Sequence, residues 1–447
     1  MQMPQHRPRT LIIGLGKTGL SCARFLAGHG VEVAVTDSRE RPPGLKELRN
    51  TVPDAAVFVG GFSEEALKRA DQVVLSPGIA LATPFIAKAR SLGLPVFGDI
   101  ELFARQTHAP VVAITGSNGK STVTTLLGRM SEQAGIDVRA GGNLGTPALD
   151  LIHGKEPQLY VLELSSFQLE VTASLQCVAA TVLNISPDHL DRYATLADYA
   201  AAKARIFNHC DVAVVNRDDA RVRAMPKPGQ KQLSFGLQAP DAGNYGLIIH
   251  GGERWLARGA ERLLRADELR MCGDHNLANA LAALALGEAA GLPRAGMLAA
   301  LKGFSGLPHR MQYVATVRGV SYYDDSKGTN VGATLAAVSG LSGPLVLIAG
   351  GDGKQQDFSP LVEALAGKTR AVVLLGKDAS VIAAVLAARL PVQQVKDMEA
   401  AVQAAVQLAQ PGDLVLLSPA CSSLDMFDNF EHRGRVFAQA VRRIAGG

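Results

Sequence analysis

The stretch VVAITGSNGKST, residues 111–122, runs from an apolar segment through two glycines into a Lys-Ser-Thr triplet. A strand that turns through glycines into a helix lets backbone N–H groups surround phosphate oxygens. Lys120 would neutralise the terminal phosphates, and a following hydroxyl would ligate Mg²⁺. The full phosphate-loop pattern is not met, because position 114 is Ile and not Gly. The shorter pattern still predicts an ATP site over Gly116, Ser117, Asn118, Gly119, Lys120, Ser121 and Thr122.

A second glycine loop lies upstream, in LIIGLGKTGL, residues 11–20. Gly14, Gly16 and Gly19 would allow a tight turn and a close approach of the backbone to a diphosphate. The next strand ends at Asp37, where an acidic residue often holds a ribose. Taken alone, this pattern is typical of an NAD-dependent oxidoreductase. A strand–helix turn without a ligand is the alternative, and the pattern does not decide between them.

Two polar residues follow strands of the same region as the phosphate loop. Glu163 lies at the end of LYVLEL, and His189 follows AATVLNI. In an open parallel sheet, ligands lie outside the carboxyl ends of the strands. A carboxylate and an imidazole at that edge can hold Mg²⁺ around a transferring phosphate. The alternatives are a helix-capping glutamate and a solvated loop histidine, and the shared edge favours the metal.

Strand-like and helix-like patches alternate almost throughout the chain, which predicts an α/β protein with parallel sheets. We place boundaries near residues 98–110 and in the Gly- and Pro-containing stretch 303–314. The region 222–270 is rich in Gly, Pro and Arg and predicts short strands or loops. The predicted domains are a Rossmann-like domain (1–100), a P-loop-type ATPase (101–306) and a second Rossmann-like domain (307–447).

The composition limits the functional class. Of 447 residues, 47% are hydrophobic and 19% charged, and the small net charge of +4 without a basic run argues against a nucleic-acid partner. No apolar run reaches transmembrane length, and the polar N-terminus predicts no secretory signal. We therefore expect a cytoplasmic protein. Scattered cysteines without a CxxC pair fit a reducing compartment; they are Cys22, Cys177, Cys210, Cys272 and Cys421.

Motifs in the same order along nearly the whole chain resemble those of the Mur ligases, most closely of the members that add D-glutamate. They are ITGSNGKST, LELSSFQLE, NISPDHLDRY followed by DYAAAKARIF, GDHNLANALAA, LPHR, DDSKGTN and SPACSSLDMFDNFEHRG. The resemblance implies a UDP-binding domain, a central ATPase and an amino-acid domain. It would explain why one chain carries two glycine loops, one for a UDP-sugar and one for ATP.

The resemblance also implies roles for individual residues. For the UDP-sugar these are Gly16, Lys17, Asp37, Ser38, Arg39, Gly78, Asn143 and His189. For ATP, Asn276, Asn279, Arg310 and Asp325 join the phosphate loop. For D-glutamate they are Lys327, Thr329, Lys354, Ser423 and Phe430. The implied catalytic residues are Lys120, Glu163, His189 and Lys203, and the implied metal ligands are Ser121, Glu163, His189 and a carbamylated Lys203. Spacing alone would make Lys203 an ordinary helix lysine, and Lys17 could equally point outward.

The implied reaction adds D-glutamate to UDP-N-acetylmuramoyl-L-alanine through an acyl phosphate, with ATP as a substrate. Mg²⁺ is the expected cofactor, a monovalent cation is allowed, and a monomer is expected. Three alternatives remain open from the residues: a ligase that adds glutamate to a folate, an NAD-dependent oxidoreductase, and an ATP-driven switch or binding module.

Overall fold

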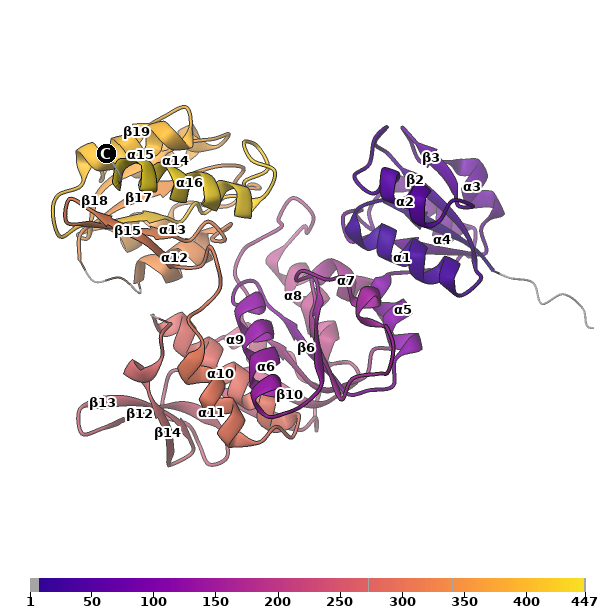
Figure 1. Cartoon of the computed structure of the whole chain (residues 1–447), viewed down its shortest axis with the longest axis horizontal. Coiled ribbons are helices and arrows are strands. Elements are labelled where there is room, and N and C mark those ends of the chain that lie inside the picture. Colours follow the sequence, from indigo (N-terminus) through magenta and orange to yellow (C-terminus); the bar gives the residue numbers. More distant parts are fainter. Residues whose placement is uncertain (1–7, 272, 340, 342, 446–447) are drawn as a thin grey trace, which may run out of the picture.

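The computed structural model describes residues 8–271, 273–339, 341 and 343–445. These form three lobes, each built around its own sheet (Figure 1). The N-terminal and C-terminal lobes each adjoin the central lobe. The predicted class, a three-domain α/β protein, is confirmed, whereas the boundaries at residues 100 and 306 stay predictions. The four described cysteines are free, and Cys272 and residues 1–7 lie outside the described part.

The N-terminal lobe is a five-stranded parallel sheet in the order β3-β2-β1-β4-β5. Its elements are β1 (Arg9–Ile13), α1 (Lys17–Gly28), β2 (Glu32–Asp37), α2 (Leu45–Thr51), β3 (Ala56–Val59), α3 (Glu64–Arg69), β4 (Gln72–Leu75), α4 (Pro84–Ser91) and β5 (Val96–Phe97). The strand order reverses direction beside β1, which is where such sheets bind ligands. The first glycine loop lies at this point. A side chain at Gly19 would collide with the carbonyl of Gly14, so the turn requires glycine.

The central lobe holds a nine-stranded sheet in the order β14-β13-β12-β11-β10-β9-β6-β8-β7. Its strands are β6 (Val111–Thr115), β7 (Val138–Gly142), β8 (Leu159–Glu163), β9 (Cys177–Val182), β10 (Cys210–Asn216), β11 (Gln232–Phe235), β12 (Tyr245–His250), β13 (Glu253–Arg258) and β14 (Glu261–Arg265). The fully buried β6 lies between β8 and β9 and pairs in parallel with both. The irregular region 222–270 continues the sheet, because β12, β13 and β14 form antiparallel hairpins at its edge.

Helices and 3₁₀ turns cover the central sheet. They are α5 (Asp99–Gln106), α6 (Lys120–Gln133), η1 (Ala148–Leu151), α7 (Ser166–Glu170), α8 (Leu196–Ala204), η2 (Arg205–Phe207), α9 (Ala220–Arg223), η3 (Ala266–Glu268), α10 (Asp274–Ala289) and α11 (Arg294–Gly303). Helix α6 begins directly at the end of the phosphate loop. Its N-terminus therefore points its free N–H groups at the carboxyl edge of the sheet.

The C-terminal lobe is a six-stranded sheet in the order β15-β16-β20-β17-β18-β19. Its elements are β15 (Gln312–Val317), β16 (Val320–Asp324), α12 (Val331–Ser339), β17 (Leu345–Ala349), α13 (Pro360–Leu365), β18 (Thr369–Leu374), α14 (Ala379–Leu386), β19 (Val392–Gln394), α15 (Met398–Leu408), β20 (Leu414–Leu417) and α16 (Phe430–Ala445). Among the described strands of this lobe, only β15 and β16 pair in antiparallel fashion. The buried guanidinium of Arg433 donates to the carbonyls of Ser326 and Cys421, so α16 fixes two loops at the carboxyl edge.

The lobes are joined in two different ways. One apolar cluster runs from the N-terminal sheet into the central lobe, from Ile12 through Phe103 to Tyr160. The clusters of the C-terminal lobe contain residues of that lobe alone, within the described part of the chain. Its contact with the central lobe is instead polar: Asn330 bonds Asn118, and the Nζ of Lys354 lies 3.1 Å from Asp188. The C-terminal lobe is therefore the one that can move at lower cost.

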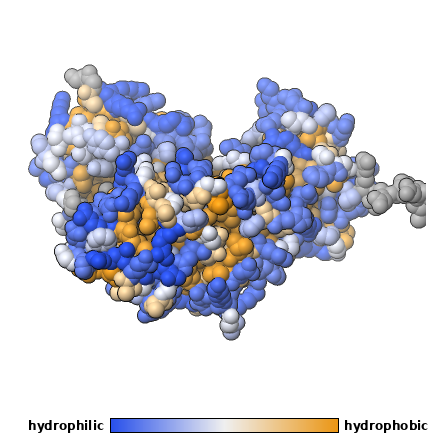
Figure 2. All heavy atoms as spheres, turned by 60° about the horizontal axis from the view of Figure 1, so that its bottom comes forward, coloured by the Kyte–Doolittle hydropathy of each residue, from blue (hydrophilic) through white to orange (hydrophobic). Residues whose placement is uncertain are grey.

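The outer surface is mixed in character. Figure 2 shows the face that carries the lower part of Figure 1, where apolar residues are interspersed among hydrophilic ones on the central lobe. Ile249, on β12, is 78% exposed, the highest exposure of a large apolar side chain among the described residues. Among the described residues, no helix has the length and apolarity that crossing a bilayer requires.

Asp99, the first residue of α5, lies buried where the N-terminal and central lobes meet. Gln168 donates a hydrogen bond of 2.9 Å to its Oδ2. Its Oδ1 has no hydrogen-bond partner among the described residues. Burial raises the pKa of this carboxyl from 3.8 to about 6, because the charged form loses its hydration.

This raised pKa predicts a pH-dependent stability. Between pH 4 and 6 the unfolded state loses the Asp99 proton while the folded state keeps it, so wild-type stability falls by up to about 3 kcal/mol. Asp99→Asn lacks this fall. Thermal unfolding should show equal stability of the two proteins near pH 4 and a higher melting temperature for the variant at pH 8. The exposed Asp54→Asn is the control; equal behaviour of Asp99→Asn and wild type at both pH values would contradict the account.

Candidate active site

The phosphate loop, residues 116–119, connects β6 to α6. Gly116 and Gly119 have φ angles of +151° and +84°, which side-chain-bearing residues rarely adopt. A side chain at Gly119 would also collide with the amide oxygen of Asn279 on α10. Both glycines are therefore required for the turn, as the sequence predicted from the motif.

Asn184, which follows β9, fixes the conformation of this loop through hydrogen bonds. The N–H of Asn118 donates to the Asn184 Oδ1 at 2.9 Å, and the Asn184 Nδ2 donates back to the Asn118 carbonyl at 3.1 Å. The N–H of Ser117 donates to the Asn184 carbonyl, also at 2.9 Å. A second contact joins the Ser117 hydroxyl to the carbonyl of Ser186 at 3.0 Å. The loop is thus shaped by its neighbours before a ligand arrives.

Two lysines converge on the same loop carbonyl. The Nζ of Lys120 donates to the carbonyls of Gly116 at 2.8 Å and Ser117 at 2.9 Å. The Nζ of Lys203, 2% exposed on α8, donates to Gly116 at 3.0 Å and to the Thr115 hydroxyl at 3.2 Å. Burial lowers the pKa of both amines. The pKa of Lys203 falls well below its usual value, mainly because the amine is buried and further because Lys120 repels its charge.

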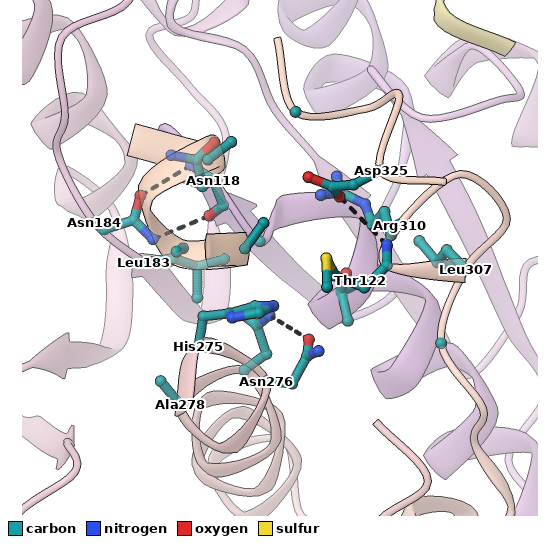
Figure 3. Close-up of a pocket in the computed structure, with 18 of the residues that line it drawn as sticks. Asn118, Thr122, Leu183, Asn184, His275, Asn276, Ala278, Leu307, Arg310 and Asp325 are labelled. Carbon is teal, nitrogen blue, oxygen red and sulfur yellow. Dashed lines mark hydrogen bonds between the residues drawn. The ribbon is translucent and has the colours of Figure 1, made fainter. Parts of the chain in front are cut away.

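A first pocket opens on one side of the loop, between the central and C-terminal lobes. Figure 3 shows Asn118 and Asn184 on one wall, His275 and Asn276 from α10 below, and Arg310 and Asp325 opposite. The predicted ATP residues that line it are Asn118, Gly119, Thr122, Asn276, Asn279, Arg310 and Asp325.

Asp325 is nearly buried in this first pocket. The Ser418 hydroxyl donates to its Oδ2 at 2.7 Å, and the N–H of Met311 donates to its Oδ1 at 3.3 Å. Burial nevertheless raises its pKa to about 7, against the opposing effect of Arg310. An approaching cation or hydroxyl donor can therefore draw this carboxyl into its charged form near neutral pH.

A second pocket of about 1010 Å³ opens on the other side of the loop, and all three lobes line it. Asn118 and Arg310 line both pockets. The predicted residues in the second pocket are Gly78, Ser117, Asn118, Lys120, Ser121, Asn143, Glu163, His189, Lys203, Arg310, Lys327, Thr329 and Lys354. The structure thus brings the proposed catalytic set together from separate parts of the chain.

The hydrogen bonding of Glu163 indicates whether this pocket can hold a metal ion. Its Oε1 accepts a bond of 2.7 Å from Asn143, whereas its buried Oε2 has no hydrogen-bond partner among the described residues. A carboxylate oxygen in that state suits a hard cation such as Mg²⁺. The residues present fit the ion, although no group of three His, Cys, Asp or Glu able to hold a metal occurs in the described part of the chain. The remaining ligands would have to be a hydroxyl, an imidazole nitrogen, a carbamate and water.

His189 lies in this pocket in an unusual backbone state, with φ +55°. Burial lowers its pKa to about 4, although Asp188 opposes the change. The imidazole is therefore neutral at ordinary pH and can accept a proton or coordinate a metal.

The predicted UDP-sugar residues divide into two groups. Gly78 and Asn143 line the second pocket, whereas Gly16, Asp37 and their neighbours lie at the ends of β1 and β2. Asp37 is buried: its Oδ2 accepts the N–H of Leu15 at 2.7 Å, and both oxygens accept from the Arg39 guanidinium. These bonds hold its pKa near 2 against burial. Asp37 thus fixes the glycine loop. Its contact with a ribose stays a prediction, as do the contacts of Lys17 and Ser38 with the UDP-sugar.

The predicted D-glutamate residues also divide. Lys327, Thr329 and Lys354 line the second pocket, whereas Ser423 and Phe430 are not among its lining residues. Phe430 instead lies beneath Lys327, whose Nζ is 3.7 Å from the ring centre. Burial lowers the pKa of Lys327 to about 8.

Sequence reasoning missed the residues that connect these parts. Asn330 donates to Asn118 and to Asp188, each at 3.2 Å, and thereby ties the C-terminal lobe to the phosphate loop. Asp188 also accepts from Lys354. Asn330 and Asp188 each lie inside a motif quoted above, so the motifs indicated that these residues matter. The order of residues along the chain does not show which motifs face one another in the fold.

Three family models match consecutive parts of the chain. They are the Mur ligase MurD-like N-terminal domain (residues 8–98), the Mur ligase middle domain (114–287) and the Mur ligase glutamate ligase domain (309–421). The chain belongs to the Mur ligase family. This membership confirms the resemblance. Two of the alternatives, an NAD-dependent oxidoreductase and an ATP-driven switch or binding module, are left without support.

Relatives match over nearly their full length. The UDP-N-acetylmuramoylalanine–D-glutamate ligase of Nitrosococcus oceani is 58% identical over 99% of this chain and 98% of its own. The ligase of the same name from Pseudomonas aeruginosa is 54% identical over 97% and 98%. Among solved structures, the UDP-N-acetylmuramate–alanine ligase of Thermotoga maritima matches with a TM-score of 0.62 and 19% identity, covering 98% of this chain and 99% of its own. That likeness supports the fold alone.

The loop geometry predicts the effect of shortening Asn184. Asn184→Ala removes both side-chain bonds to Asn118, so the loop should lose its preset shape. The KM for ATP should then rise about tenfold, which corresponds to the net free energy of one to two hydrogen bonds. The fold should stay intact, because the backbone contact from Ser117 remains. Steady-state kinetics with ATP as the varied substrate measures this. An unchanged KM for ATP would show that Asn184 does not preshape the loop.

Proposed function

We propose that this chain is an ATP-dependent ligase that joins the amino group of D-glutamate to the L-alanyl carboxyl of UDP-N-acetylmuramoyl-L-alanine. The products are an amide, ADP and phosphate, and the reaction belongs to peptidoglycan precursor synthesis for the cell wall, in the cytoplasm. Support comes from relatives of this name that match the chain nearly end to end at 50–58% identity. The proposal includes a monomer and allows a monovalent cation.

The observation that carries the proposal is the arrangement of the two pockets. A nucleotide in the first pocket and an acid in the second would meet at the phosphate loop, where Asn118 and Arg310 line both. Four basic side chains besides Lys203 line the second pocket, namely Lys120, Arg310, Lys327 and Lys354. Such a surrounding suits two anionic substrates and a triphosphate tail.

The proposed chemistry needs activation, because an amide does not form spontaneously from a carboxylate and an amine in water. The L-alanyl carboxylate attacks the γ-phosphate of ATP, giving an acyl phosphate and ADP. Lys120, released from its loop carbonyls, and Arg310 reduce the repulsion between the anions. The amine of D-glutamate then attacks the acyl carbon, and phosphate leaves. Lys327, Thr329 and Lys354 would hold the amino acid's carboxylates.

Mg²⁺ would be held by Ser121, Glu163, His189 and a carbamylated Lys203, and would neutralise charge on the phosphates. Lys203 is suited to this modification, because its buried side chain lines the second pocket together with Glu163, the proposed metal ligand. A carbamate replaces a repelling ammonium by an anion.

A coupled assay tests the proposed function. The purified protein, ATP, Mg²⁺ and UDP-N-acetylmuramoyl-L-alanine are supplied with one amino acid at a time, and phosphate release and product mass are followed. D-Glutamate should give an amide product with one phosphate per bond. L-Glutamate and D-aspartate should give little. A product with a pterin acceptor, and none with the UDP-sugar, would favour the folate ligase.

Lys120→Ala should abolish turnover and leave the fold intact. The lysine neutralises phosphate charge in the transition state, and its loss should lower kcat by at least about a hundredfold. Circular dichroism checks the fold, and the exposed Lys155→Ala is the matched control on the same lobe. Near-normal ADP release by Lys120→Ala would refute the role of the lysine.

Removal of dissolved carbon dioxide tests the modification of Lys203. A carbamate forms reversibly from a neutral amine and carbon dioxide, so enzyme dialysed without bicarbonate should lose activity and regain it when bicarbonate is added. Lys203→Met should be inactive under both conditions. A carbamate is lost in acid, so mass spectrometry of the acidified protein would miss it. ¹³C NMR with labelled bicarbonate detects the carbamate directly and does not depend on activity. Full activity without bicarbonate would contradict the modification.

A further inference from the structure

Arg192 crosses from the central lobe to the N-terminal lobe. It lies in the loop between β9 and α8, three residues after His189. Its Nη1 donates to the carbonyl of Pro77 at 2.9 Å, and its Nη2 donates to the carbonyl of Ile79 at 3.0 Å. These two carbonyls flank Gly78, which lines the second pocket. One side chain thus holds both ends of the segment by which the N-terminal lobe reaches the site.

The same guanidinium packs on the ring of Phe167, at 3.7 Å from the ring centre. Phe167 in turn contacts His189 edge-on, with ring centres 4.9 Å apart. His189 has a positive φ, a conformation that persists only when its surroundings hold it. A continuous set of contacts therefore runs from the N-terminal lobe through Arg192 and Phe167 to His189.

A polar seam between these lobes also lies away from Arg192. Asp150 in η1 accepts from Ser21 at 2.7 Å and from Arg24 at 2.9 Å, both on α1. The shared apolar cluster and this seam fix the position of the N-terminal lobe, whereas the 77–79 segment at the pocket requires an anchor of its own. Arg192 supplies such an anchor at the pocket, with two hydrogen bonds in fixed geometry from one planar group.

We propose that Arg192 is a positioning residue that sets how the N-terminal lobe presents the UDP-linked substrate to the phosphate loop, and that it also steadies His189. Arg192 lines neither pocket, so it acts through the 77–79 segment and Phe167. The inference rests on the proposed function in one respect, the identity of the substrate. A displacement of about 1 Å between reacting groups costs up to about a hundredfold in rate, which is why an anchor outside the pocket matters.

The experiment compares Arg192→Met and Arg192→Lys with wild type. Calorimetry measures the Kd of UDP-N-acetylmuramoyl-L-alanine and, separately, of a non-hydrolysable ATP analogue, and kinetics give kcat. Arg192→Met should raise the Kd of the UDP-linked substrate about tenfold and lower kcat about tenfold or more. The Kd of the ATP analogue should stay within about twofold. Arg192→Lys can reach one of the two carbonyls, so its Kd and kcat should lie between those of wild type and Arg192→Met.

Arg217→Met is the matched control. Arg217 is also half-buried, and its guanidinium donates to the carbonyls of Gly236, Gln238 and Tyr245, all within the central lobe. Thermal unfolding of each variant reports any general loss of stability. Arg217→Met should lose stability without a change in the Kd of the UDP-linked substrate.

The outcomes separate the two proposals. Wild type that neither binds nor converts the UDP-linked substrate refutes the proposed function. Wild type that is active, with Arg192→Met showing the same Kd for that substrate as Arg217→Met, refutes the positioning role. Equal weakening of both ligands by Arg192→Met also refutes it, because that pattern indicates a general disturbance. If Arg192→Met does not fold, the Kd values of Arg192→Lys decide in the same way.

Discussion

The site depends on one constraint: the backbone between β6 and α6 must turn without side-chain bulk. Gly116 and Gly119 meet this constraint with positive φ angles, and Asn184 and Ser186 hold the turn from the adjacent strand end. Because the loop is thin, a pocket can open on either of its sides. A single preformed loop can then offer N–H groups to phosphate and hold Lys120 ready, and neither pocket would exist in this form if the turn carried a β-carbon.

The way the lobes are joined follows from the same arrangement. The N-terminal lobe shares apolar core with the central lobe, so its position is nearly built in. The C-terminal lobe is tied through Asn330 and through the Lys354–Asp188 pair, which are polar contacts that water or a substrate can replace. The amino-acid side of the site can thus open and close, whereas the nucleotide-sugar side keeps its place. Closure would also keep water from an acyl phosphate.

Much of this could be predicted from the sequence, for physical reasons that differ by residue. The α/β class follows from apolar periodicity, and the glycines of the two loops follow from steric need. Short strands such as β5 and β19 escaped prediction, because two or three residues give no periodic signal. Asp37 was expected at a ribose, and that contact stays a prediction. Its bonds to the Leu15 N–H and to Arg39 could not be predicted, because residue type does not show which bonds are already made. Contacts between lobes, such as Asn118–Asn330, join residues far apart in the chain.

The central claim is that the carboxylate in one pocket takes the phosphate from the nucleotide in the other. The most direct measurement uses UDP-N-acetylmuramoyl-L-alanine labelled with ¹⁸O in its carboxylate. If the acyl phosphate forms, one carboxylate oxygen must leave with phosphate, so mass spectrometry should find one ¹⁸O in each phosphate released. Unlabelled phosphate, formed together with the amide, would show that the carboxylate never attacks ATP and would contradict the account.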